Sequence, residues 1–232
     1  MRRALFAVVA FVCALLVAPS ASAFSAAFFS AAPKTLVCDG DSITKEDSLA
    51  GPGEVPDPTQ RWCARAARAA RGHPRMLNVA VSGSYGSHWA NVPAAVRAQG
   101  KRVVYVYLTG VNGINSSGKT GAQVLTDIAA DIAAVRADGV TEVVIGTMPS
   151  VCFQPGKSLA DSTKEGYRVA ANAGIVSGLV GQTRLADYAA DATLAALIDS
   201  ADDIHPPYSD GLTDGVASML RIVQPAINAA LR

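Results

Sequence analysis

Ser42 lies in a short polar motif, Gly40-Asp41-Ser42, that follows an apolar run from Thr35 to Cys38. A serine hydroxyl becomes an effective nucleophile when a nearby base accepts its proton. Histidine suits that role because its pKa lies near neutrality, and a carboxylate can then fix the tautomer of the ring. Ser42 is therefore a candidate nucleophile whose base and acid must come from elsewhere in the chain.

Three histidines could supply the base, namely His73, His88 and His205. His205 lies in a polar, proline-bearing loop and closely follows two acids, Asp202 and Asp203. This spacing can place a carboxylate and the imidazole on one side of a turn. The residues alone leave Asp202 and Asp203 as competing partners of His205.

Acyl transfer also needs hydrogen-bond donors that meet the oxyanion as it forms. Gly83 and Asn112 each follow a further apolar run, in the segments Ser82-Gly83-Ser84 and Gly110-Val111-Asn112. The backbone N–H groups of Ser42 and Gly83 and the side-chain amide of Asn112 are the candidate donors. Glycine suits such a position because it allows close approach to the backbone.

Taken in order, these segments resemble the four blocks of the SGNH hydrolases, also called GDSL esterases and lipases. The resemblance implies Ser42 as nucleophile, His205 as base and Asp202 as the residue that orients it, and an oxyanion hole made by Ser42, Gly83 and Asn112. It also implies an acyl-enzyme intermediate and no need for a cofactor or a metal. One departure is Gly113, which stands where the family often has an aspartate and could loosen the loop around Asn112.

The elements that must position these residues alternate between strands and helices. Strands are predicted at Thr35–Cys38, Arg75–Val81, Val103–Leu108, Glu142–Met148 and Arg184–Asp187, and helices at Gln60–Arg71, Asn91–Gln99, Ala122–Ala137, Lys164–Leu179, Ala189–Ile198 and Thr213–Leu231. This alternation indicates a parallel sheet with helices on both faces, whose working groups gather at the carboxyl ends of the strands. We expect a three-layer α/β/α sandwich with about five parallel strands, and the resemblance implies its flavodoxin-like form.

The first residues are typical of a secretory signal peptide. Arg2 and Arg3 precede an apolar run from Ala4 to Ala18, and the small residues Ala21-Ser22-Ala23 suit cleavage. The run is shorter than the roughly 20 residues of a membrane-spanning helix. We therefore predict a signal peptide over 1–23, a linker over 24–34 and one hydrolase domain over 35–232, in a secreted or periplasmic protein with no stable membrane span.

Composition narrows the choice of partners. The chain of 232 residues carries a formal net charge of +1 and only 6% aromatic residues, so neither a basic surface nor a base-stacking surface for nucleic acid is expected. We expect a monomer that acts on a small-molecule or carbohydrate ester. The Gly and Pro content of the loops at 45–59 and 150–159 favours an open rim, and hence short acyl or acetyl esters of lipid or carbohydrate.

Three cysteines remain after signal cleavage, Cys38, Cys63 and Cys152. An odd number allows at most one disulfide within the chain, and a bridge from Cys38 or Cys63 to Cys152 is a possible pairing outside the cell. Their spacings match no zinc-binding pattern.

Two other functions compete with ester cleavage. The segment from Gly113 to Thr120 matches the phosphate-binding pattern GxxxxGK[ST], which would make the chain a nucleotide-binding protein. The preceding strand ends several residues early for that motif, and no aspartate closes the next strand to bind magnesium. The remaining alternative is a secreted binding module that keeps the fold without catalysis.

Overall fold

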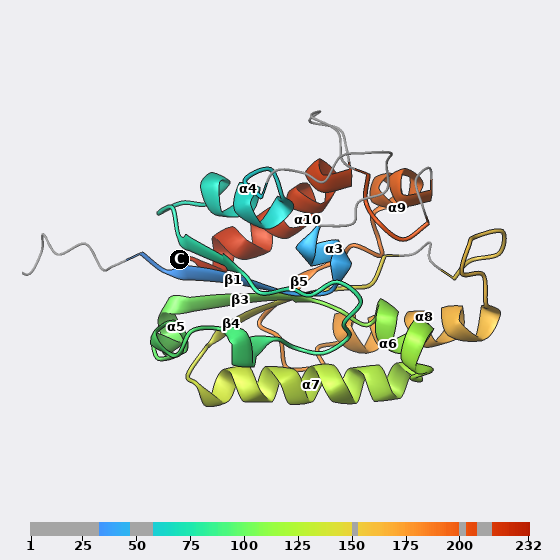
Figure 1. The fold of residues 1–232 in the computed structure, drawn as a ribbon, viewed down its shortest axis with the longest axis horizontal. Coiled ribbons are helices and arrows are strands. Elements are labelled where there is room, and N and C mark those ends of the chain that lie inside the picture. The colour runs from blue at the N-terminus through green and yellow to red at the C-terminus, as the bar shows by residue number, and fades with distance from the viewer. Residues whose placement is uncertain (1–32, 47–57, 150–152, 200–202, 208–214) are drawn as a thin grey trace, which may run out of the picture. The chain divides into compact units, whose positions relative to one another are not determined.

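A five-stranded parallel sheet forms the centre of the computed structural model, which describes residues 33–46, 58–149, 153–199, 203–207 and 215–232. The strands run in the order β2-β1-β3-β4-β5 (Figure 1). Their bounds are β1 Thr35–Gly40, β2 Arg75–Asn78, β3 Val103–Leu108, β4 Glu142–Gly146 and β5 Arg184–Ala186. The predicted parallel sheet of about five strands is confirmed.

Strands β1 and β3 lie side by side in the middle of the sheet, and every residue of both is buried. Strands covered on both faces read as apolar runs, which is why Val103 to Leu108 is such a strong strand signal. Their parallel register places Gly40 beside Leu108. The segments that follow them, which carry Ser42 and Asn112, therefore start at the same edge of the sheet.

Helices cover both faces of the sheet, as Figure 1 shows. Helices α4, α9 and α10 lie on one side, and α5, α7 and α8 lie on the other. The helices are α3 Ser42–Lys45, α4 Trp62–Ala69, α5 Ala94–Arg97, α6 Val111–Ser117, α7 Gly121–Ala137, α8 Ser162–Val176, α9 Ala192–Asp199 and α10 Gly215–Ala230, with 3-10 turns η1 Trp89–Asn91 and η2 Gly100–Arg102. The expected three-layer α/β/α sandwich is confirmed.

Several boundaries differ from the sequence prediction. Helices α3 and α6 lie outside the helices predicted from the sequence. The helix predicted over Asn91–Gln99 is divided into η1 and α5, because Pro93 cannot donate a backbone hydrogen bond. In α10, by contrast, Pro225 lies inside a continuous helix.

A disulfide joins Cys38 on β1 to Cys63 on α4, with the two Cα atoms 6.4 Å apart. Both residues are completely buried. The suggested bridge from either of them to Cys152 is therefore wrong, because each is already bonded to the other; Cys152 lies outside the described residues. The bond fastens α4 to β1 four residues before Ser42.

The predicted signal peptide and most of the linker fall on residues 1–32, outside the part of the chain that the structure describes. Residues 33–232 contain the sheet and all the described helices. None of those helices combines the length and the apolar character needed to cross a membrane.

Candidate active site

The turn after β1 presents Ser42 at the start of α3. Gly40 has a φ of +142°, and a Cβ atom there would lie 2.0 Å from the carbonyl oxygen of Leu108, so no other residue fits this turn. The side chain of Asp41 caps α3 by accepting a hydrogen bond from the Ile43 N–H at 3.0 Å. Ser42 follows as the first helical residue and is 9% exposed.

Helix α3 has only four residues, and tertiary contacts hold it in place. Glu46, in left-handed conformation at its end, accepts a hydrogen bond from the N–H of Trp62 at the start of α4. The side-chain amide of Asn78, at the end of β2, donates to the carbonyl oxygen of Thr44. These contacts fix the position of the Ser42 side chain relative to the sheet.

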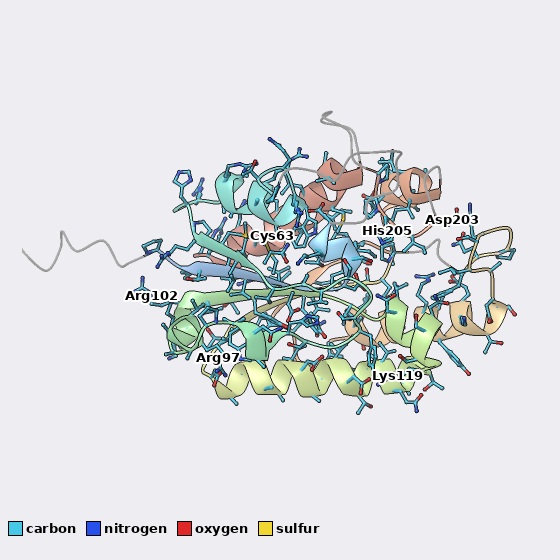
Figure 2. All side chains as sticks on the ribbon, in the orientation of Figure 1. Cys63, Arg97, Arg102, Lys119, Asp203 and His205 are labelled. Carbon is cyan, nitrogen blue, oxygen red and sulfur yellow. A yellow bond between two sulfur atoms is a disulfide. The ribbon has the colours of Figure 1, made fainter. Side chains whose placement is uncertain are left out.

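The structure brings Ser42 and His205 into direct contact. The Nε2 atom of His205 lies 2.8 Å from the Oγ atom of Ser42. Figure 2 shows His205 beside α3, at the edge of the sheet where the strands end. With its proton on Nδ1, the imidazole can accept the serine proton through Nε2, which is the arrangement that general-base activation requires.

Of the two acids that closely precede His205, Asp203 lies in the part of the chain that the structure describes. Asp203 has a positive φ of 66°, and its carboxylate accepts a hydrogen bond from the Ser158 N–H and lies 3.8 Å from the ammonium group of Lys157. In Figure 2 it lies farther from α3 than His205 does, near the loop before α8. Asp203 is thus engaged with residues other than His205, while Asp202 lies outside the described residues.

The segment that carries Gly83 is attached to the nucleophile turn. The N–H of Val81 and the hydroxyl of Ser84 both donate to the carbonyl oxygen of Gly40, at 3.0 and 3.3 Å. The side-chain amide of Asn112 donates to the carbonyl oxygen of Ser84 at 3.0 Å, so α6 is hydrogen-bonded to the same segment. The three candidate oxyanion donors thus come from segments that are hydrogen-bonded to one another.

Gly83 has a φ of +77°, and its missing side chain leaves open space, since no atom lies within 4 Å of where a Cβ would be. No other atom therefore crowds this side of the Gly83 backbone. Gly113, the departure from the family pattern, lies inside α6 rather than in a loop. The loosening that we expected around Asn112 is not observed, because the helix and the bond to Ser84 hold this residue.

Burial makes the carboxyl group of Asp41 a weaker acid than an ordinary aspartate. Desolvation is the main cause, and it raises the pKa of Asp41 to about 6. The hydrogen bond from Ile43 and the electrostatic interaction with His205 act in the opposite direction. A titratable group next to the nucleophile thus changes charge in mildly acidic solution.

The other two histidines do not contact Ser42. His73 has a φ of +43° and lines an open hollow of about 340 Å³ between α4 and β2, together with Ala64 and Met76. His88 is bound to the carboxylate of Asp39 through Nδ1 at 2.7 Å. Of the three candidate bases, His205 is the one that the structure places against the nucleophile.

The segment that resembled a phosphate-binding loop has a different structure. Residues 113–117 belong to α6, and Thr120 caps α7 in a reciprocal arrangement with Gln123. The ammonium group of Lys119 pairs with Asp127 and lies 4.7 Å from the centre of the Tyr85 ring. A phosphate-binding loop needs free backbone N–H groups that converge on an anion, and a helix commits these groups to its own hydrogen bonds. The nucleotide-binding prediction is therefore not supported by the structure.

Sequence comparisons with family models and with curated proteins find no match. Solved structures, in contrast, are clearly similar. A carbohydrate acetylesterase family member from Sinorhizobium meliloti aligns with a TM-score of 0.61 at 16% identity, over 85% of this chain and 99% of that one. A member of the lipolytic G-D-S-L family from Veillonella parvula aligns with a TM-score of 0.58 at 16% identity, over 82% and 96%. The chain has the SGNH hydrolase fold.

A third structure with this fold, TesA, aligns with a TM-score of 0.56 at 22% identity, over 85% of this chain and 99% of that one. The SGNH hydrolase fold implied by the four sequence blocks is thus confirmed. Within it, the contact of His205 with Ser42 is an observation on this chain's own residues.

Sequence reasoning overlooked Asp39, a completely buried carboxylate one residue before the nucleophile turn. A charged residue in an otherwise apolar strand is a signal that it has specific partners, since aspartate is almost never fully buried unpaired. Within the described residues, no three His, Cys, Asp or Glu side chains gather into a potential metal site.

Proposed function

We propose that this chain is a secreted serine esterase that hydrolyses carboxylic esters through an acyl-enzyme intermediate. The single observation that carries the proposal is the 2.8 Å separation between His205 Nε2 and Ser42 Oγ. The fold supports it, since the similar structures include a carbohydrate acetylesterase family member and a lipolytic G-D-S-L protein.

In the proposed reaction, the Ser42 hydroxyl attacks the ester carbonyl while His205 accepts its proton. The oxyanion of the tetrahedral intermediate then receives hydrogen bonds from the N–H groups of Ser42 and Gly83 and from the amide of Asn112. When the intermediate collapses, His205 returns the proton to the departing alcohol. Water, deprotonated by His205, then releases the acid from Ser42.

The residue that orients His205 in this proposal is Asp202, as the family pattern implies. Asp203 is the weaker candidate because its carboxylate already accepts from the Ser158 N–H and lies near Lys157. The intact Ser42–His205 pair favours catalysis over a binding module that has lost it.

We further propose short acyl or acetyl esters of lipid or carbohydrate as the substrate class. The acetylesterase and lipolytic structures with this fold support that range. The proposed export agrees with the buried Cys38–Cys63 disulfide, because such bonds persist in oxidising compartments.

The test is reaction of the protein with a fluorophosphonate, followed by peptide mapping, alongside hydrolysis of p-nitrophenyl acetate, butyrate and octanoate. We expect a single adduct on Ser42 and no adduct in Ser42→Ala or His205→Ala, with acetate and butyrate preferred over octanoate. Ser177→Ala, which alters a serine at the end of α8, is the matched control and should label normally. An adduct on another residue, or none on the folded protein, would contradict the proposal.

A further inference from the structure

Asp39 is a buried acceptor in the middle of a hydrogen-bond network. Its Oδ1 atom accepts from the N–H of Gly40 and faces Nδ1 of His88, each at 2.7 Å. Its Oδ2 atom accepts from the N–H of His88 at 2.7 Å, the hydroxyl of Ser87 at 3.1 Å and the hydroxyl of Tyr105 at 2.6 Å. An ionised carboxylate only accepts hydrogen bonds, so His88 faces it with a proton on Nδ1.

A second carboxylate, on the helix layer that contains α7, binds the same segment. Asp131, on α7, accepts from the N–H of Ser87 at 3.1 Å and from the hydroxyl of Tyr107 at 2.6 Å. Ser87 also uses its hydroxyl oxygen to accept from the N–H of Trp89 at 3.0 Å. Ser87 is thus tied to β1 through Asp39 and to α7 through Asp131, and its hydroxyl oxygen lies 2.9 Å from the hydroxyl of Tyr105 on β3.

These contacts hold the C-terminal end of the segment at 79–89. Gly83 lies in the interior of this segment. At its start, the N–H of Val79 donates to the carbonyl oxygen of Cys38 and that of Val81 donates to Gly40. At its far end, Ser87 and His88 bind Asp39. Both ends are therefore attached to the last residues of β1, immediately before Ser42.

We infer that Asp39 is a positioning residue that fixes the Gly83 amide relative to Ser42 and so completes the oxyanion hole. The inference rests on the proposed function, because Gly83 needs such placement only if an oxyanion forms beside Ser42. Oxyanion donors work by being held in advance where charge develops, so a small displacement of the Gly83 segment reduces their effect.

Substitution of Asp39 by asparagine tests this role because the side chain keeps its shape but exchanges one of its two acceptor oxygens for an NH₂ donor. Whichever way the amide is turned, its NH₂ group faces a backbone donor, either the N–H of Gly40 or that of His88. Two donors that face each other cannot form a hydrogen bond, and the buried N–H is left without an acceptor. One orientation thus disturbs the turn before Ser42 at Gly40, and the other loosens the segment at 79–89 at His88, so either changes the placement of Gly83 relative to Ser42.

The experiment compares the wild-type protein with Asp39→Asn and with a matched control, Asp138→Asn. Asp138, at the surface, accepts a hydrogen bond at 2.9 Å from the indole N–H of Trp89, which is the last residue of the same segment. For Asp39→Asn we expect kcat on p-nitrophenyl acetate to fall by about 10- to 100-fold while KM changes by less than about threefold. Binding of phenylboronic acid, which forms a tetrahedral adduct with serine, should weaken by a similar factor, and Asp138→Asn should match the wild type.

Hydrogen exchange of the amides of residues 83–88 gives a readout that does not depend on activity. Faster exchange there in Asp39→Asn supports the anchoring role even if the wild type hydrolyses no ester, in which case only the proposed function fails. Wild-type kcat and unchanged exchange in a folded Asp39→Asn protein would overturn the inference.

A second pair of variants covers the case in which Asp39→Asn does not fold. His88→Leu removes the side-chain donor to Asp39, whereas the amide nitrogen of His88→Asn can take the place of Nδ1. We expect kcat to fall by about tenfold in His88→Leu and to return to within about threefold of wild type in His88→Asn. Equal kcat values in both variants would contradict the positioning role.

Discussion

The Nε2 atom of His205 lies 2.8 Å from the Oγ atom of Ser42, although the two residues are 163 positions apart in the chain. Ser42 is carried by the turn after β1, and His205 by the segment between α9 and α10. On the C-terminal side of His205, a hydrogen bond from the N–H of Gly215 to the carbonyl oxygen of Pro207 joins this segment to the start of α10. The contact therefore depends on both the sheet edge and the packing of α10.

Replacing His205 by alanine should remove the base without disturbing the sheet. We expect kcat for p-nitrophenyl acetate to fall by about 10⁴-fold or more, because serine alone is a weak nucleophile. KM should change little, and the melting temperature should stay close to that of wild type. His73→Ala, at the hollow between α4 and β2, is the control and should keep full activity; more than a tenth of wild-type kcat in His205→Ala would exclude His205 as the base.

The two acids before His205 should respond differently to the same change. Asp202→Asn should lower kcat by about 10⁴-fold, since an amide in place of the orienting carboxylate favours the wrong tautomer of the imidazole. Asp203→Asn should leave kcat within about threefold of wild type and weaken only the contacts with Ser158 and Lys157, which at the surface contribute about 1 kcal/mol or less. Asparagine also tolerates the positive φ at this position.

The opposite result, with activity lost only in Asp203→Asn, would assign the orienting role to Asp203. Steady-state kinetics together with urea unfolding of both variants separates an effect on catalysis from an effect on stability.

The sequence predicted the elements whose signal is local and strong. Val103 to Leu108 is apolar throughout because both faces of β3 are covered, and the predicted bounds agree with the structure. Helix α7 begins at Gly121, one residue before the predicted start, because Thr120 and Gln123 form a capping box. Ser42 and His205 came from the blocks of a known family, whose parallel sheet explains how they can meet at one edge.

The features that the sequence did not reveal depend on which surfaces meet. Helices α3 and α6 are too short to be stable alone, so their tertiary contacts determine them. The pairing of Cys38 with Cys63 follows from the packing of α4 on β1, which no spacing rule specifies. The partners of Asp39 likewise come from three parts of the fold, namely β1, β3 and the segment at 79–89.

Asp41→Asn should change how stability depends on pH. Because burial raises the pKa of Asp41 from its ordinary value of 3.8 to about 6 in the folded protein, the folded state binds this proton more tightly than the unfolded state. The free energy of unfolding therefore falls as pH rises through the window from about 4 to 6. Asparagine cannot ionise and caps helices as well as aspartate does.

At pH 7.5 we therefore expect Asp41→Asn to be more stable than wild type by about 1 to 3 kcal/mol, with the advantage vanishing below about pH 4. Urea unfolding at pH 4, 5.5 and 7.5 measures this difference. Asp161→Asn is the matched control, because Asp161 caps α8 in the same way near the surface. A constant difference between Asp41→Asn and wild type at all three pH values would contradict the assigned cause.

The Cys38–Cys63 disulfide should contribute strongly to stability. Its closure links residues 25 positions apart, and the double variant Cys38→Ala/Cys63→Ala should lose about 2 to 4 kcal/mol of unfolding free energy. The reason is chiefly that the unfolded chain gains conformational freedom when the link is absent, with some loss of packing between β1 and α4. Urea unfolding measures the loss, and Cys152→Ala serves as the control that should leave the midpoint nearly unchanged.

Thiol titration checks the pairing itself. After the proposed signal cleavage the chain carries three cysteines, Cys38, Cys63 and Cys152, so the unreduced protein in denaturant should show one reactive thiol and the reduced protein three. Alkylation before reduction should mark Cys152 in peptide mapping. A mark on Cys63 or Cys38 in the unreduced protein would show that the disulfide joins a different pair, and would remove the covalent link that holds α4 against the nucleophile's own strand.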